Sequence, residues 1–76
     1  MGMDETKLSR FDRLAGIAGR MVADTVTDAL RKGIDPEAHV SAMLDEVERT
    51  WPPIGQAIRG LVEASPEVQA VFRASL

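Results

Sequence analysis

Cysteine is absent from this sequence, which excludes disulfide bonds and thiolate metal sites as sources of stability. Long apolar runs are absent too, since no stretch approaches the roughly 18 apolar residues that cross a membrane as a helix. The net charge of −3 gives no general attraction to nucleic acid or to anionic membranes. A chain of 76 residues forms one domain with a modest core, near the size at which isolated domains become marginally stable. Oligomerisation is the remaining common way for so small a domain to gain stability.

The N-terminal residues and the composition indicate where the protein acts. Asp4 and Glu5 stand where a secretory signal needs basic and then apolar residues, so we expect a cytoplasmic protein. We expect a single helical domain over residues 1–76, with residues 1–3 as an expression tag or a disordered start. The Ala- and Arg-rich, Lys-poor composition is typical of a small bacterial or phage protein.

No strand-like alternation occurs in the sequence, and capping signals divide it into four helices. Gly33 is typical of a left-handed helix C-cap, while Asp35-Pro36 and Ser65-Pro66 are typical of helix starts. The Trp51-Pro52-Pro53 segment must end the second helix, because proline blocks its continuation. The expected helices run from Asp4 or Thr6 to Lys32, from Pro36 to Thr50, from Pro53 to Ala64, and from Pro66 onward.

Each of the three shorter helices has one ordinary apolar face. These faces consist of Val40, Met43, Leu44 and Val47; Ile54, Ala57, Ile58, Leu61 and Val62; and Val68, Val71, Phe72 and Leu76. Helices of this length reach roughly 15 to 22 Å at a rise of about 1.5 Å per residue. They therefore cover only part of a first helix that is about 40 Å long by the same rise.

The first helix is apolar around most of its circumference. This apolar surface is larger than the three short helices are expected to cover. Its main stripe consists of Leu8, Phe11, Leu14, Ala15, Ala18, Val22, Val26 and Ala29, widened by Gly16, Ile17, Gly19, Met21, Ala23 and Leu30. We therefore expect a homodimer or a complex with a larger protein partner. The predicted interface consists of Phe11, Leu14, Ile17, Ala18, Gly19, Met21 and Val22, with Trp51 as a further contact.

Small residues cluster in the middle of this helix. Ala15, Gly19 and Ala23 are spaced four apart, and Gly16 and Ala18 lie beside them. Small side chains let two helix backbones approach closely, and glycine inside a helix costs about 1 kcal/mol relative to alanine. The cluster predicts a helix crossing, either with a partner helix or with another helix of the same chain.

A strip of arginines gives the alternative hypothesis of a helix-turn-helix-like regulator that binds nucleic acid. Arg13, Arg20 and Arg31 share the polar side of the first helix, but aspartates are interspersed with them, which indicates a solvated face. The third helix offers only Gln56 and Arg59 to bases, after a Trp-Pro-Pro turn. Nucleic-acid binding is therefore not the expected function.

Catalytic, cofactor and metal signatures are not found in the sequence. His39 is the only histidine, and one histidine does not define a metal site. The four serines lie at helix faces or caps, and Ser41 lies two residues from His39, so their side chains point to different sides of a helix. We expect neither an enzyme nor a bound cofactor.

Trp51 is the sole tryptophan and lies at the corner between the second and third helices. It is expected to close the core over this corner, with an exposed anchor for a partner as the alternative, because tryptophan is enriched at binding hot spots.

The sequence thus predicts an all-α protein with a long N-terminal helix and three short helices, completed by oligomerisation. The predicted function is that of a small protein–protein interaction module, such as a regulator, adaptor or inhibitor, that acts through the apolar face of the first helix.

Overall fold

The structure, a computed structural model, describes the backbone of residues 2–76 and the side chains of residues 12–76. Within residues 2–76 it contains helices and no strand, which confirms the predicted all-α class. The four helices are α1 (Gly2–Lys32), α2 (Pro36–Thr50), α3 (Pro52–Ala64) and α4 (Pro66–Ser75). Two starts differ from the prediction: α1 begins at Gly2 instead of Asp4 or Thr6, and α3 begins at Pro52 instead of Pro53.

Gly33 ends α1 as its position after the last helical residue predicts. Its φ of 72° is the left-handed conformation that glycine adopts without strain. The Ile34 N–H donates to the Ala29 carbonyl over 2.8 Å, and the Gly33 N–H donates to the Leu30 carbonyl over 3.3 Å. These two bonds form a Schellman motif, which turns the chain within two residues toward the start of α2.

The expected N-caps also form. The Asp35 carboxylate accepts a 3.1 Å hydrogen bond from the Ala38 N–H at the start of α2. The Ser65 hydroxyl accepts a 3.4 Å bond from the Val68 N–H at the start of α4. Trp51 alone connects α2 to α3, with φ −136° and ψ 82°, outside the helical region, as expected for a residue before proline.

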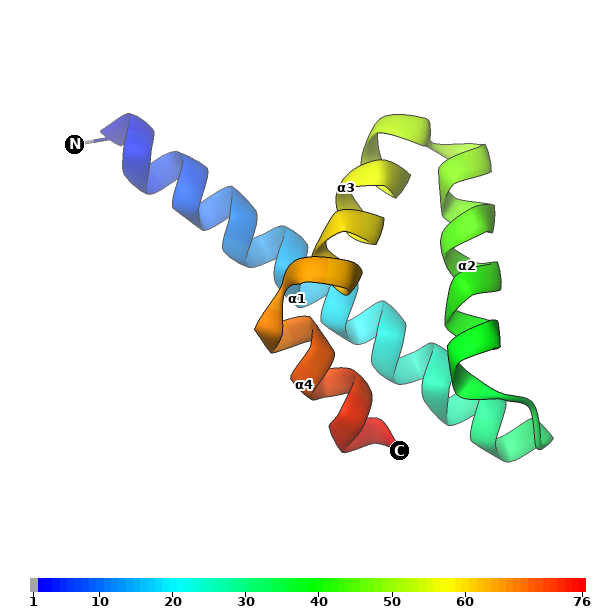
Figure 1. The fold of residues 1–76 in the computed structure, drawn as a ribbon. Helices are drawn as coiled ribbons and strands as arrows, with labels where there is room; N and C mark the ends of the chain where they lie inside the picture. Colours follow the sequence, from blue (N-terminus) through cyan, green and yellow to red (C-terminus); the bar gives the residue numbers. More distant parts are fainter. Residues whose placement is uncertain (1) are drawn as a thin grey trace.

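The molecule is a thin slab in which α1 forms the long axis, with α2 and α3 on one flank of α1 and α4 on the other in the view of Figure 1. Its Cα extents are 48 × 27 × 16 Å, and its radius of gyration is 13.1 Å. A compact domain of this length has a radius of gyration of about 11.4 Å. The N-terminal turns of α1 project beyond the other three helices (Figure 1), so the chain is more extended than a compact domain.

The core is built from small aliphatic side chains on all four helices. The fully or almost fully buried residues are Ala18, Val22, Val26 and Ala29 of α1, Val40 and Leu44 of α2, Ile58 of α3, and Val68 of α4. Half-buried apolar side chains pack around them, including Leu14 and Met21 of α1 and Phe72 of α4. The burial of Val40, Leu44, Ile58 and Val68 confirms the apolar faces predicted for the three short helices.

A close approach of α2 and α3 depends on Gly55. An ideal Cβ at this position would lie 2.6 Å from the backbone nitrogen of Glu48 and nearer still to its Cα. Real Cβ atoms do not approach backbone atoms so closely, so only glycine fits between the two helices.

An ion-pair cluster fastens α3 to α2 beside this close approach. The Arg59 guanidinium donates from Nε to the Glu48 carboxylate and from Nη2 to the Asp45 carboxylate, the latter over 2.6 Å. These two acceptors, Glu48 first, raise the pKa of Arg59 further above its usual range. The guanidinium is therefore a structural group held between two helices.

A second polar cluster joins α2 to α1. Asp28 accepts hydrogen bonds from His39 Nε2 over 2.9 Å and from Lys32 Nζ over 3.0 Å. The ring nitrogen must be the donor, because an ionised carboxylate only accepts. The bonds from His39 and Lys32 lower the pKa of Asp28 below its ordinary value of 3.8.

We expect Gly55→Ala to lower the free energy of unfolding by about 1–3 kcal/mol, because the added methyl group meets the backbone of Glu48 and the two helices must shift apart. Gly60→Ala is the matched control on the same helix, since its Cβ would meet nothing within 4 Å. It should gain up to about 1 kcal/mol from helix propensity. Urea unfolding followed by circular dichroism measures both changes, and equal effects would contradict the close packing at Gly55.

We expect Asp28→Asn to lower stability at about pH 5 and to have less effect as the pH falls below about 3.8. Because the folded-state pKa is depressed, the ionised carboxylate stabilises the fold above the unfolded-state pKa, and this contribution disappears as the pH falls through the folded-state pKa. Urea unfolding across this range measures the difference. In a background carrying His39→Ala and Lys32→Ala, the substitution should lose its pH dependence. A pH-independent effect in the parent would be contrary to this assignment.

Candidate interaction surface

The structure places several predicted interface residues inside the chain. Ala18 and Val22 have no exposed surface, and Gly19 is buried under α4, where a Cβ would lie 3.6 Å from the Val71 side chain. Leu14 and Met21 are half-buried and pack against the core. The helix crossing at Gly19 is therefore made by α4 of the same chain, and a bulky residue at Ala18 or Gly19 would disturb the fold itself.

Two of the predicted interface residues are on the surface, far apart in the sequence. Ile17 of α1 is 52% exposed, and Trp51 at the α2–α3 corner is 60% exposed. The expectation that Trp51 closes the core over the corner is wrong, because most of the residue is exposed to solvent. The side chain of Phe11 lies outside the part of the chain that the structure describes.

Other large apolar side chains are exposed near the ends of helices: Leu30, Ile34, Ile54 and Leu76. Ile54 and Leu76 were expected on buried faces. Ile54 lies in the first turn of α3, and Leu76 is the residue after α4, so each has a neighbouring helix on few sides.

A groove of about 450 Å³ runs between α1 and α4. Its floor holds the small residues Ala15, Gly16, Gly19 and Ala23 of α1, and its α4 wall holds Val68 and Val71. Gly16 is open, since a Cβ there would meet nothing within 4 Å. The groove is therefore the part of the small-residue cluster that α4 leaves uncovered.

Charged side chains line the groove on either side of Gly16. Asp12 and Arg20 line the groove four residues before and four residues after Gly16, and Glu67 adds a carboxylate from α4. Asp12 and Arg20 are exposed, and neither forms an ion pair with any residue whose side chain is described. From the sequence, Arg20 was expected only as part of the arginine strip. The i, i+4, i+8 spacing of Asp12, Gly16 and Arg20 is the signal that would have placed them in one row.

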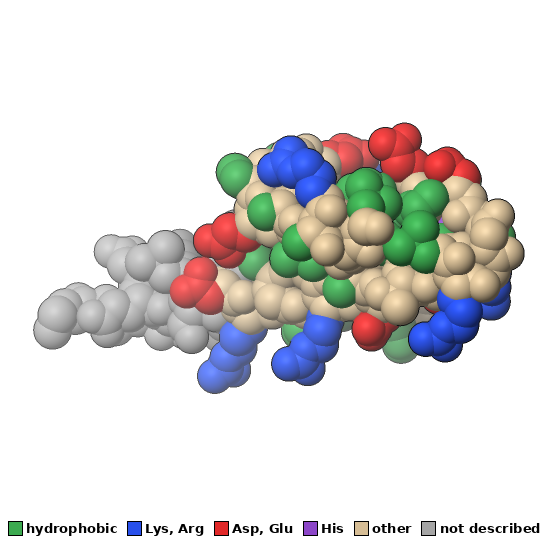
Figure 2. Space-filling model, turned by 90° about the horizontal axis from the view of Figure 1, so that it is seen from below, with side chains coloured by type: hydrophobic (Ala, Val, Ile, Leu, Met, Phe, Trp, Pro, Cys, Tyr) green, Lys and Arg blue, Asp and Glu red, His purple; other side chains and the backbone are tan. Residues whose placement is uncertain are grey.

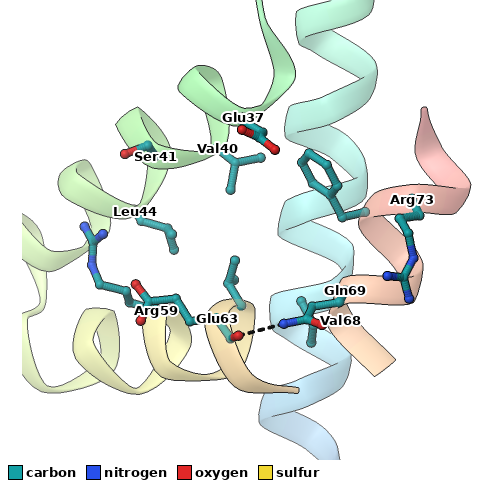
Figure 3. Close-up of a pocket in the computed structure, with 11 residues that line it drawn as sticks. Glu37, Val40, Ser41, Leu44, Arg59, Glu63, Val68, Gln69 and Arg73 are labelled. Carbon is teal, nitrogen blue, oxygen red and sulfur yellow. Dashed lines mark hydrogen bonds between the residues drawn. The ribbon is translucent and has the colours of Figure 1, made fainter. Parts of the chain in front are cut away.

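A second groove, of about 430 Å³, lies between α2 and α4, which do not pack against each other (Figure 3). Its walls combine apolar side chains with a polar rim, and α3 closes one end. The Gln69 side-chain amide donates to the Glu63 carbonyl over 2.6 Å across this end (Figure 3). The lining residues include Val40, Leu44, Val62, Val68 and Phe72, with Glu37, Ser41, Arg59 and Arg73 on the rim.

The charges around this second groove do not select one occupant. Arg59 is already held by Glu48 and Asp45 on α2, so it is not available to a ligand. The remaining rim charges, Glu37, Glu63 and Arg73, are of mixed sign and exposed.

The arginine strip is on the surface. Arg13, Arg20 and Arg31 are exposed, and Figure 2 shows basic side chains projecting along one edge of the molecule with acidic side chains nearby. Residues 36–76 carry twice as many acidic as basic side chains, so the positive potential does not extend beyond α1. Of the two α3 side chains that could have read bases, Arg59 is tied to α2.

The described residues 12–76 contain no group of three or more His, Cys, Asp or Glu side chains arranged to hold a metal ion. Helices α1 to α4, over their described residues, include none with the length and apolar character needed to span a bilayer.

The chain matches no known protein family, and comparison with curated proteins and with solved structures found no match.

We expect no binding to generic duplex DNA at physiological salt, because the exposed arginines alternate with aspartates and few phosphates are neutralised together. An electrophoretic mobility shift and retention on heparin at moderate salt measure this. The variant Arg13→Gln with Arg20→Gln serves as the control for any weak residual retention. A submicromolar shift that this double variant abolishes would contradict the expectation and support a nucleic-acid-binding regulator.

Proposed function

We propose that this protein is a small protein–protein interaction module, of the kind that serves as a regulator, adaptor or inhibitor. The groove between α1 and α4 is the contact surface, and its occupant is an α-helix of another polypeptide chain. The observation that carries this proposal is the uncovered small-residue floor of α1, flanked by exposed charges.

The shape of the groove favours a helix as the occupant. Small residues at Ala15, Gly16 and Ala23 leave no side chain that would hold a second helix axis away from α1. The half-buried Val71 gives the occupant apolar surface from α4. Recognition of a helix by an apolar groove is a common mode of protein binding.

We expect Gly16→Glu to abolish binding of the partner while leaving the free energy of unfolding within about 1 kcal/mol of the parent. The carboxylate side chain fills the open floor of the groove, and Gly16 touches no other helix of its own chain. Light scattering on the purified protein, and affinity capture from the host followed by mass spectrometry, measure self-association and binding of another protein.

Gly60→Glu is the matched control, because Gly60 is also an exposed helical glycine with open space around its Cβ. It should retain whatever the parent binds. If Gly16→Glu and the parent form the same assemblies and capture the same proteins, the groove is not the contact surface.

A further inference from the structure

We infer that the occupant of the α1–α4 groove is α1 of a second copy of this chain, lying antiparallel and crossing at Gly16. This inference rests on the proposed function and adds the identity, direction and register of the partner helix. It is carried by the charges of one row of described residues and by the position of that row along α1.

The row Asp12, Gly16 and Arg20 is complementary to itself when it is reversed. Residues four apart on a helix form the ridges that pack against a neighbouring helix. A two-fold axis at Gly16 places the residue four before the crossing beside the residue four after it on the other helix. Asp12 of each copy therefore lies beside Arg20 of the other, and the two glycines meet at the axis.

Both charges are available for such pairing. Asp12 and Arg20 are eight residues apart, about 12 Å along the helix axis, so they are too distant to pair within one copy. Their side chains are exposed, and the ion pairs among described residues leave both out. A parallel arrangement in the same register would instead place Asp12 beside Asp12 and Arg20 beside Arg20, which is repulsive.

The crossing point also lies at the middle of the longest helix. α1 runs from Gly2 to Lys32, so Gly16 is within one residue of its centre. An antiparallel crossing there lets two helices of about 46 Å share the greatest length of contact. The same two-fold axis places the exposed Ile17, on the flank of the row opposite Ala15, beside Ile17 of the second copy, which buries apolar surface of both chains.

The experiment uses charge reversal in the full chain, with dissociation constants from analytical ultracentrifugation at low ionic strength. Asp12→Arg and Arg20→Asp should each raise the dimer dissociation constant about tenfold or more, since each places like charges together twice. The double variant should return to within about threefold of the parent, because each pair is restored with its signs exchanged. All four proteins should keep the same helical circular dichroism.

Mixing the two single variants gives the sharpest result. Asp12→Arg and Arg20→Asp each associate poorly alone, but an equal mixture brings only opposite charges together and should form a one-to-one heterodimer. Arg73→Asp is the matched control, with the same change in charge at an exposed arginine that lines the α2–α4 groove instead. Its dissociation constant should stay within about twofold of the parent.

Three results would overturn the antiparallel pairing: additive weakening in the double variant, no heterodimer in the mixture, or an Arg73→Asp effect equal to that of Arg20→Asp. A parent that stays monomeric at every concentration would also overturn it. In that last case, a heterologous protein captured by the parent and lost with Gly16→Glu would leave the proposed function standing. If Gly16→Glu keeps both self-association and binding of another protein, the proposed function is wrong as well.

Discussion

Three helices share one narrow row of α1, and burial of that row holds the four helices together. Ala18, Val22 and Val26 are spaced four apart and are fully buried, while α2, α3 and α4 each supply one or two aliphatic residues against them. Because these side chains are small, the helix axes lie close together. The close approach at Gly55 is a separate contact between α2 and α3, where an added methyl group would meet the backbone of Glu48.

The helix boundaries were the most predictable part of the fold, because they depend on local chemistry that is visible in the sequence. Asp35-Pro36 and Ser65-Pro66 form the predicted caps, and Gly33 takes the left-handed conformation required at its position. Gly55 was not predictable in this way. Its role depends on which residue of α2 lies opposite, and that contact is set by the crossing of two helices.

The candidate site was only partly predictable for a related reason. Helical spacing identifies the small residues Ala15, Gly16 and Gly19, but a helical wheel does not say which side of α1 its own chain takes. The structure assigns Ala18 and Val22 to the core and leaves Gly16 open. The exposed Trp51 has the same cause, since its proline neighbours fix the corner but not the direction of the side chain.

The thinness of the slab, 16 Å in its shortest extent, has a consequence for melting. A domain of this length unfolds near 60 °C with an enthalpy of only about 50 kcal/mol, so heat denaturation of one copy spreads over a wide temperature range. A second chain that binds only the folded form adds its own enthalpy and shifts the midpoint by mass action. The width of the calorimetric transition then reports the quaternary state, because a complex of two chains melts over a narrower temperature range than one copy. Its midpoint also rises as the protein concentration is raised.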